Sequence, residues 1–146
     1  MKPRQPRLTK GKNGIPTEIY IDGASRGNPG NSGLGILIKD KNKDHRIKKY
    51  LGILTNNQAE YSAFITALEF ARKLKKDSIT IYTDSLLLAN QINGIWQVES
   101  PNIKPLYEKA KKLLGEFKQV EVRHIPRELN READRLANEA IDEYAY

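Results

Sequence analysis

Cysteine is absent from this chain, and only two of its 146 residues are histidine. The absence of cysteine excludes disulfide bonds and thiolate metal sites, so any metal centre must be built mainly from carboxylates. Oxygen ligands favour Mg²⁺ or Mn²⁺ over Zn²⁺. Long apolar runs are also absent: none approaches the roughly 20 residues of a membrane span, and no signal-peptide core follows the basic N-terminus. We therefore expect a cytoplasmic protein with no membrane partner.

Acidic residues are missing from the first 16 positions, although the whole chain has 18 of them against 25 lysines and arginines. The segment contributes five cations to the net charge of +7, namely Lys2, Arg4, Arg7, Lys10 and Lys12. Its prolines and glycines, together with its lack of large apolar side chains, predict a disordered tail over residues 1–16, followed by one folded domain over 17–146. The tail is either a tether for a phosphate backbone or a solubilising extension.

Two short apolar runs, at 19–23 and 81–85, contain an aspartate where the apolar character ends, Asp22 in the first and Asp84 in the second. Side chains alternate along a strand, so each aspartate shares a face with the tyrosine two positions before it. If the two strands are adjacent and parallel, both carboxylates meet at the carboxyl edge of the sheet, where open α/β sheets bind ligands. Two like charges held together favour a cation between them, so the pair predicts a metal site.

The periodicity along the chain predicts a single α/β domain. Strands are expected at 17–22, 34–39, 46–51, 78–83 and 119–125. Helices are expected at 57–75 and 85–93, and two further helices are expected, one that ends at 114 and one that begins after a cap at 130. The glycine-rich stretch 23–33 is expected as a turn-rich connection, and 41–44 as a polar hairpin loop. This order gives a mixed five-stranded sheet, with three antiparallel strands and two parallel ones, and helices on its faces.

Two further acids lie on predicted helices, and each has a structural alternative. Glu60 follows Asn57 at capping-box spacing, but it also shares the apolar stripe of Phe64 and Ala67, which must face the sheet. Asp134 lies in the first turn of the last helix, where an acid complements the helix dipole. Helical geometry leaves both interpretations open for each residue.

Four segments, in order, resemble the signature segments of type 1 ribonuclease H, in its archaeal-type branch: 22–30, 55–60, 83–85 and 130–134. The resemblance implies the ribonuclease H-like fold, with helices on both faces of the sheet. It also implies an endonuclease that hydrolyses the RNA strand of RNA/DNA hybrids and leaves 5′-phosphate and 3′-hydroxyl ends. Asp22, Glu60, Asp84 and Asp134 would then bind two divalent cations about 4 Å apart, Mg²⁺ with Mn²⁺ as a substitute.

The resemblance also implies which residues contact the substrate. Selectivity for RNA must come from 2′-hydroxyl contacts, because the grooves of an A-like duplex do not permit base readout. In similar enzymes these contacts come from the first glycine loop and from the asparagines before the glutamate. The corresponding residues are Gly23, Ala24, Ser25, Asn28, Asn56 and Asn57, with Ser85 and Asn130 at positions that often face the duplex. Ser85 and Asn130 fit equally well as caps of their helices.

Two features depart from many bacterial relatives. The long basic insertion after the second helix is missing, since residues 93–104 are short and hold Lys104 as their only base. The loop histidine that assists product release in those relatives has two candidate counterparts, His124 and Arg127. The shorter loop of the archaeal-type branch favours Arg127 as the catalytic residue, and we interpret His124 as the buried end of the last strand.

The alternative function is a non-catalytic module that binds RNA/DNA hybrid or double-stranded RNA on the same fold. All four acids are present, however, and a protein that only binds nucleic acid would have no use for four acids that repel one another. Reverse-transcriptase domains, resolvases and transposases share the fold but typically carry further domains. We therefore predict a monomeric, cytoplasmic nuclease whose partner is RNA/DNA hybrid, and leave open whether it also cleaves double-stranded RNA.

Overall fold

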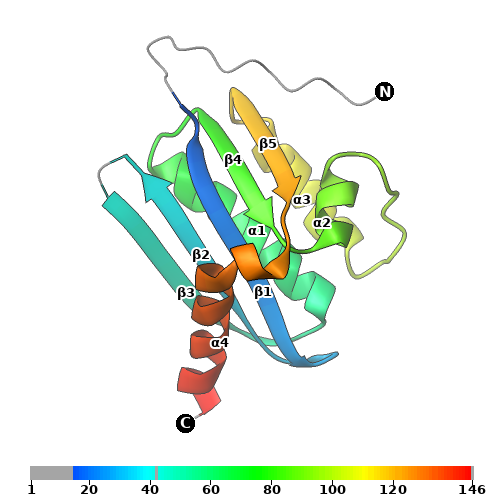
Figure 1. The fold of residues 1–146 in the computed structure, drawn as a ribbon. Coiled ribbons are helices and arrows are strands. Elements are labelled where there is room, and N and C mark those ends of the chain that lie inside the picture. Colours follow the sequence, from blue (N-terminus) through cyan, green and yellow to red (C-terminus); the bar gives the residue numbers. More distant parts are fainter. Residues whose placement is uncertain (1–14, 42, 146) are drawn as a thin grey trace.

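The computed structural model describes residues 15–41 and 43–145, and these contain one mixed five-stranded sheet (Figure 1). The strands are β1 (Thr17–Gly27), β2 (Gly30–Asp40), β3 (Lys43–Leu54), β4 (Ser78–Thr83) and β5 (Gln119–His124), in the spatial order β3-β2-β1-β4-β5. The first three strands pair antiparallel, whereas β4 pairs parallel with both β1 and β5. The predicted fold class is confirmed. Most of the predicted basic tail, residues 1–14, lies outside the described residues.

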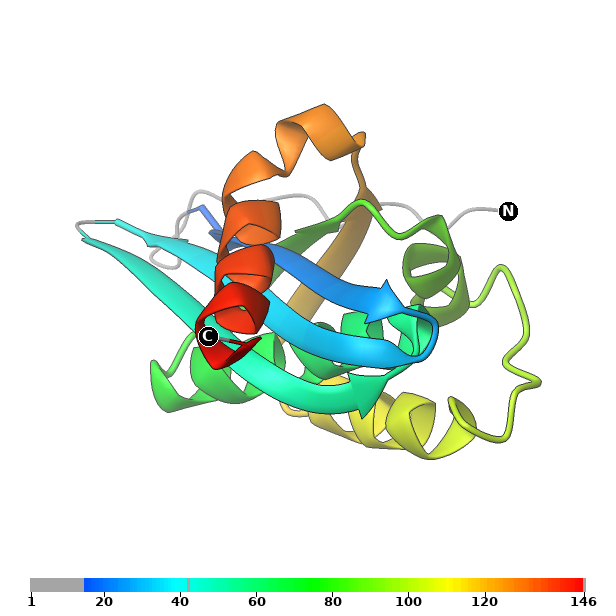
Figure 2. The same ribbon diagram turned by 90° about the horizontal axis from the view of Figure 1, so that it is seen from below.

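Helices cover both faces of the sheet, as predicted. They are α1 (Asn56–Lys73), α2 (Leu86–Ile92), α3 (Lys104–Leu114) and α4 (Arg131–Ala145), with the short 3₁₀ helix η1 (Arg127–Leu129) before α4. Figure 2 shows α4 on one side of the sheet and α1 and α3 on the other. No helix in the described part of the chain combines the length and apolar character that crossing a bilayer requires.

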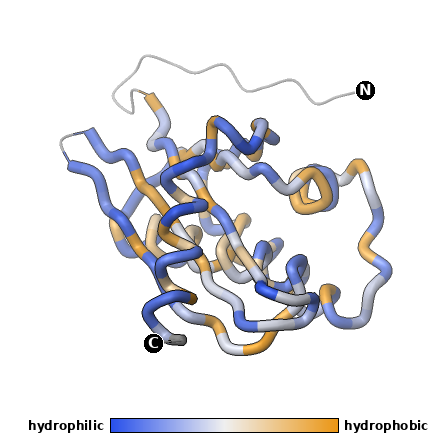
Figure 3. Tube along the Cα trace, turned by 60° about the horizontal axis from the view of Figure 1, so that its bottom comes forward, coloured by the Kyte–Doolittle hydropathy of each residue, from blue (hydrophilic) through white to orange (hydrophobic). Residues whose placement is uncertain are grey.

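The main core lies on the α1 side of the sheet. Ile19 and Ile21 of β1 form one fully buried cluster with Phe64 and Leu68 of α1. In Figure 3 the hydrophobic residues concentrate on the strands and on the helices packed against them, whereas hydrophilic residues predominate along α4. α1 buries large side chains such as Tyr61 and Phe64 against the sheet, whereas most of the residues that α4 buries are alanines.

The prediction of a turn-rich connection over residues 23–33 is wrong. β1 continues to Gly27 and β2 begins at Gly30, so the two strands form a long hairpin with a tight turn. Packing explains why glycines are found inside a strand here: a Cβ on Gly35 would lie 2.1 Å from the carbonyl oxygen of Ala133, and one on Gly33 would lie 2.7 Å from that of Ala137. The glycines let α4 approach the sheet closely, which places the first turn of α4 beside the end of β1.

Candidate active site

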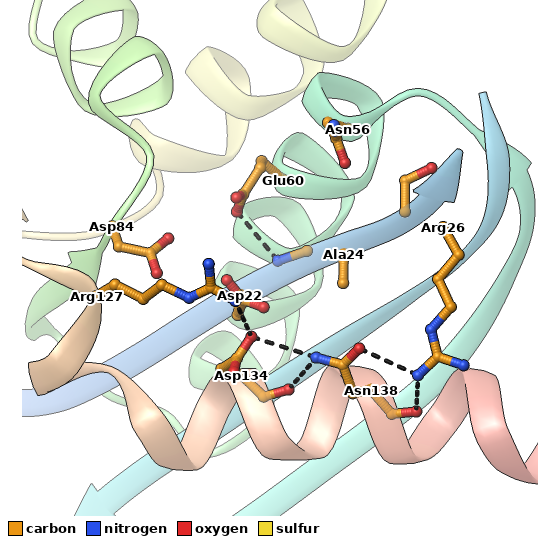
Figure 4. Close-up of a pocket in the computed structure, with 11 residues that line it drawn as sticks. Asp22, Ala24, Arg26, Asn56, Glu60, Asp84, Arg127, Asp134 and Asn138 are labelled. Carbon is orange, nitrogen blue, oxygen red and sulfur yellow. Dashed lines mark hydrogen bonds and ion pairs between the residues drawn. The ribbon is translucent and has the colours of Figure 1, made fainter. Parts of the chain in front are cut away.

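Asp22 and Asp84 lie at the same edge of the sheet. The register of the parallel strands β1 and β4 pairs Tyr20 with Tyr82 and Ile21 with Thr83, so each aspartate is the next residue toward the carboxyl end. The rings of the two tyrosines stack with their centroids 4.8 Å apart, which shows that the side chains of the two strands alternate in the same phase. The juxtaposition expected from the two strand ends is therefore present (Figure 4).

Glu60 approaches this edge from the first turns of α1. Thr55 and Gln58 form the capping box of that helix: the Thr55 hydroxyl accepts from the Gln58 amide 3.1 Å away, and the Gln58 side-chain oxygen accepts from the Thr55 amide 2.9 Å away. The capping role considered for Glu60 thus belongs to other residues. Its Oε1 instead accepts a hydrogen bond of 3.0 Å from the backbone N–H of Gly23, next to Asp22.

Asp22, Glu60 and Asp84 together form a donor set suited to a hard cation. Each offers a carboxylate oxygen, and the three oxygens lie within 4.8 Å of one another. Three anionic oxygens at this spacing match the ligand preference of Mg²⁺ and Mn²⁺. The geometry and chemistry of these residues therefore fit a divalent metal ion.

Electrostatics support the same conclusion. Burial raises the pKa of Asp22 to about 8, with the charges of Asp84 and Asp134 adding to the shift. Burial, followed by the charges of Asp22 and Asp84, also raises the pKa of Glu60 well above its usual range, although the Gly23 N–H opposes this. The pKa of Asp84 is raised mainly by burial. Ionised carboxylates held this closely repel one another, and a bound cation would offset that repulsion.

Asp134 and Arg127 complete one wall of the pocket. Both line the same cavity of about 440 Å³ as Asp22, Glu60 and Asp84. Asp134 lies in the first turn of α4, and its Oδ1 is 3.8 Å from Nη2 of Arg127. The Arg127 side chain is 78 % exposed, and its charge lowers the pKa of both Asp22 and Asp84. The fourth predicted acid is therefore near the other three, and a solvated arginine stands beside it.

The residues expected to contact substrate divide into two groups. Gly23, Ala24, Ser25 and Asn56 line the pocket with the acids. The Ser25 hydroxyl donates to the carbonyl oxygen of Leu54, 2.9 Å away. Asn28 and Asn57 are exposed and lie outside the lining, and the Asn28 side-chain oxygen accepts from the backbone N–H of Asn56 at 3.0 Å.

Ser85 and Asn130 have structural contacts. The Ser85 hydroxyl caps α2 by accepting from the Leu88 amide at 3.1 Å, which bears out its interpretation as a cap. Asn130 is 1 % exposed, and its Nδ2 donates to the carbonyl oxygen of Ile21, 2.8 Å away, immediately before Asp22. A hydrogen bond from Asn130 also lowers the pKa of Asp84. The interpretation of Asn130 as a side-chain cap of α4 is wrong, because its buried Oδ1 has no hydrogen-bond partner among the described residues, and its amide instead ties the start of α4 to β1.

The interpretation of His124 as a buried strand end is wrong. His124 is the last residue of β5, but its side chain is exposed. β5 is an edge strand, and Val122 is its only buried residue. The core therefore ends at Val122, two positions before His124. The charge of His124 lowers the pKa of Asp84, although His124 does not itself line the pocket.

Two residues of the pocket were missed by the sequence analysis, Arg26 and Asn138. Asn138 follows Asp134 by four positions, so helical spacing could have identified it as a neighbour of that acid. Arg26 bonds to α4 across more than 110 positions of sequence. No local pattern could have revealed that contact.

Comparisons with known proteins agree with this geometry. A family model described as reverse transcriptase-like matches residues 20–140. Ribonuclease HI of Halobacterium salinarum is 41% identical over 126 residues, which are 85% of this chain and 63% of that relative. Ribonuclease H of Clostridium botulinum is 36% identical over 145 residues, covering 86% of this chain and 95% of the relative. The chain thus spans less than two thirds of the length of the Halobacterium relative.

Solved structures show the same similarity in three dimensions. RNase H1 from Halobacterium salinarum NRC-1 matches with a TM-score of 0.84 and 38% identity, over 88% of this chain and 99% of that one. LC11-RNase H1, solved in complex with RNA/DNA hybrid, also matches with a TM-score of 0.84, at 36% identity, over 89% of this chain and 99% of that one. With the family match over most of its length and carboxylates at both strand ends, this chain belongs to the type 1 ribonuclease H family.

Proposed function

We propose that this protein is an endoribonuclease that hydrolyses the RNA strand of RNA/DNA hybrids. The observation that carries the proposal is the set of three carboxylate oxygens of Asp22, Glu60 and Asp84 within 4.8 Å of one another, at the carboxyl edge of the sheet. A site that only binds nucleic acid would favour cations over clustered acids, because the phosphate backbone is anionic. The complex of LC11-RNase H1 with hybrid supports the choice of substrate.

Mg²⁺ is the proposed cofactor, with Mn²⁺ as a substitute. Asp22, Glu60 and Asp84 would hold it, and Asp134 would supply the fourth carboxylate. Divalent cations at such a site activate a water nucleophile and stabilise the leaving oxygen of a phosphodiester. Hydrolysis with the 3′ oxygen as leaving group gives the 5′-phosphate and 3′-hydroxyl ends expected for the family.

The other residues of the pocket would orient the RNA strand. Gly23, Ala24 and Asn56 line the cavity beside the acids, so a ribose 2′-hydroxyl of the substrate would lie against this wall of the pocket. Contacts of this kind distinguish RNA from DNA. Glu60 is anchored to the Gly23 N–H and is thus held against the same segment that would contact the sugar.

Arg127 is the proposed residue for product release. Its guanidinium is solvated, lies 3.8 Å from Asp134 and is free of the buried contacts that would hold it in one place, as its exposure of 78 % indicates. An exposed cation beside the acids can contact the anionic product and draw it away from the carboxylates. Arg127→Ala should therefore slow turnover about 10-fold, with little change in melting temperature.

His124→Ala is the matched comparison for Arg127→Ala, because both residues are candidates for the same loop role and both side chains are exposed. Since His124 is not buried, its removal should change the free energy of unfolding by no more than about 0.5 kcal/mol. Single-turnover and steady-state cleavage rates would separate chemistry from release in both variants. A larger loss of turnover in His124→Ala than in Arg127→Ala would transfer the role to the histidine.

A gel assay on labelled RNA/DNA hybrid, double-stranded RNA and double-stranded DNA tests the proposed function. With Mg²⁺, the full chain should cut the RNA strand of the hybrid and leave DNA intact; with chelator it should cut nothing. Binding of hybrid without cleavage in either Mg²⁺ or Mn²⁺ would favour a non-catalytic module. The double-stranded RNA lane decides whether that duplex is also a substrate, and light scattering in solution tests the proposed monomer.

A further inference from the structure

Asn138 connects two residues of the pocket wall through its side-chain amide (Figure 4). The Nδ2 atom donates to Asp134 twice, to the backbone oxygen at 3.0 Å and to the carboxylate Oδ1 at 3.2 Å. On the other side, Nη2 of Arg26 donates to the Asn138 side-chain oxygen at 3.1 Å and to its backbone oxygen at 3.3 Å. Both ends of the amide are therefore engaged, and the contacts run from β1 through α4 to an acid of the site.

We propose that Arg26 and Asn138 are positioning residues that hold the carboxylate of Asp134 in its orientation toward the other acids. The proposal rests on the proposed nuclease function, since it assigns these residues a role in the same site. Asp22 and Asp84 follow paired strand residues, and Glu60 is held by the Gly23 N–H. Asp134 has neither kind of anchor, because it lies in the first turn of α4. Its Oδ1 contacts Asn138 of α4 at 3.2 Å and Arg127 of η1 at 3.8 Å, and only the Asn138 contact is within hydrogen-bonding distance.

The donors and acceptors around Asn138 fix which way its side-chain amide is turned. An amide turned by 180° would place its oxygen against the Asp134 carboxylate and its NH₂ against the Arg26 guanidinium, and both encounters are repulsive. Arg26 therefore selects the amide orientation that donates to Asp134. Asn138 thereby holds Oδ1 of Asp134 from within α4.

Arg26 itself is committed to α4. Besides its two contacts with Asn138, its Nη1 lies 2.6 Å from Oδ1 of Asp142, one turn further along the helix. These bonds anchor the end of β1 to α4, so Arg26 could act merely as a structural clamp. Asp142 separates the two roles, because removing it weakens the clamp without touching the contacts of Asn138.

Three variants of the full chain test the proposal: Asn138→Ala, Arg26→Ala and the control Asp142→Ala. Alanine is a better helix former than asparagine, so the first variant should fold. Misplacement of a catalytic group by about 1 Å can cost about 100-fold in rate, and a partial loss of orientation should cost less. We expect kcat on labelled hybrid in Mg²⁺ to fall about 10-fold in Asn138→Ala and about 3-fold in Arg26→Ala, with KM within about 2-fold of the parent. Asp142→Ala should keep the parental kcat.

Crystal structures of the metal-free parent and variants supply a readout that does not depend on cleavage. The Asp134 carboxylate should keep one rotamer in the parent and in Asp142→Ala, and should turn or occupy several rotamers in Asn138→Ala. An unchanged Asp134 rotamer in Asn138→Ala would overturn the proposal. Equal losses of kcat and melting temperature in Arg26→Ala and Asp142→Ala would also overturn it, in favour of a clamp. A parent that does not cleave hybrid would refute the proposed function, whereas the rotamers would still decide the positioning role.

Discussion

Asp22→Asn is expected to lose at least about 1,000-fold in hybrid cleavage while remaining folded. The asparagine has the size and shape of the aspartate, so no core volume changes. The substitution removes one negatively charged ligand from the centre of the donor set. Asp22 is 5 % exposed and interacts with the charges of Glu60, Asp84 and Asp134. Metal-bound chemistry contributes several kcal/mol to such reactions, and each 1.36 kcal/mol is tenfold in rate.

The melting temperature should distinguish loss of a ligand from loss of the fold. An acid whose pKa rises on folding holds its proton more tightly in the folded protein, so stability falls as the pH rises between the two pKa values. For Asp22 these are 3.8 and about 8. In chelator, the parent should therefore lose melting temperature between about pH 4 and about pH 8, and Asp22→Asn should lose less. Added Mg²⁺ should raise the melting temperature of the parent more than that of the variant.

Asp77→Asn is the control for neutralising one aspartate. Asp77 is exposed and precedes β4, at the opposite end of the strand from Asp84. Its cleavage rate and its response to Mg²⁺ should match those of the parent. Near-parental cleavage by Asp22→Asn, measured over a range of Mg²⁺ concentrations, would contradict the assignment of the donor set.

The parts of the site that could be predicted from the sequence depend on local periodicity. Alternation along two strands placed Asp22 and Asp84 on one face, and the register of β1 with β4 confirms it. The apolar stripe of α1 predicted that Glu60 faces inward, which its bond to Gly23 agrees with. The face on which a side chain lies follows from a repeat of two residues in a strand and of three to four residues in a helix, so it can be predicted within a single element.

The errors arise where tertiary packing overrides local signals. Glycines usually mark turns, and the sequence predicts one at Gly33, but this residue is in β2 because α4 lies against it, and that helix comes about 100 residues later. His124 continues the apolar face of its strand, yet the core ends before it because β5 is at the sheet edge. The contact between Arg26 and Asn138 likewise joins distant segments. None of these could be read from one element alone.

Gly23→Ala is expected to damage both the fold and the site. An added Cβ would lie 2.3 Å from the carbonyl carbon and oxygen of Ala59 and 2.5 Å from the backbone nitrogen of Glu60, far inside van der Waals contact. All three are main-chain atoms, so no side chain can rotate away and α1 must shift. Overpacking of this kind costs about 3 kcal/mol at the upper end of its usual range, or roughly 10 °C in melting temperature.

The cleavage rate should fall by more than the stability loss explains, because the same shift displaces Glu60. Its Oε1 would move away from the Gly23 N–H and from the oxygens of Asp22 and Asp84, and a misplacement of about 1 Å can cost about 100-fold in rate. Rates measured well below the melting temperature of the variant separate the two effects. Gly115→Ala is the control, since Gly115 has helical backbone angles and its Cβ would lie 3.4 Å from the nearest atom, the Lys112 oxygen. A Gly23→Ala variant with parental cleavage and stability would show that α1 does not hold Glu60 against β1 in the way the structure indicates.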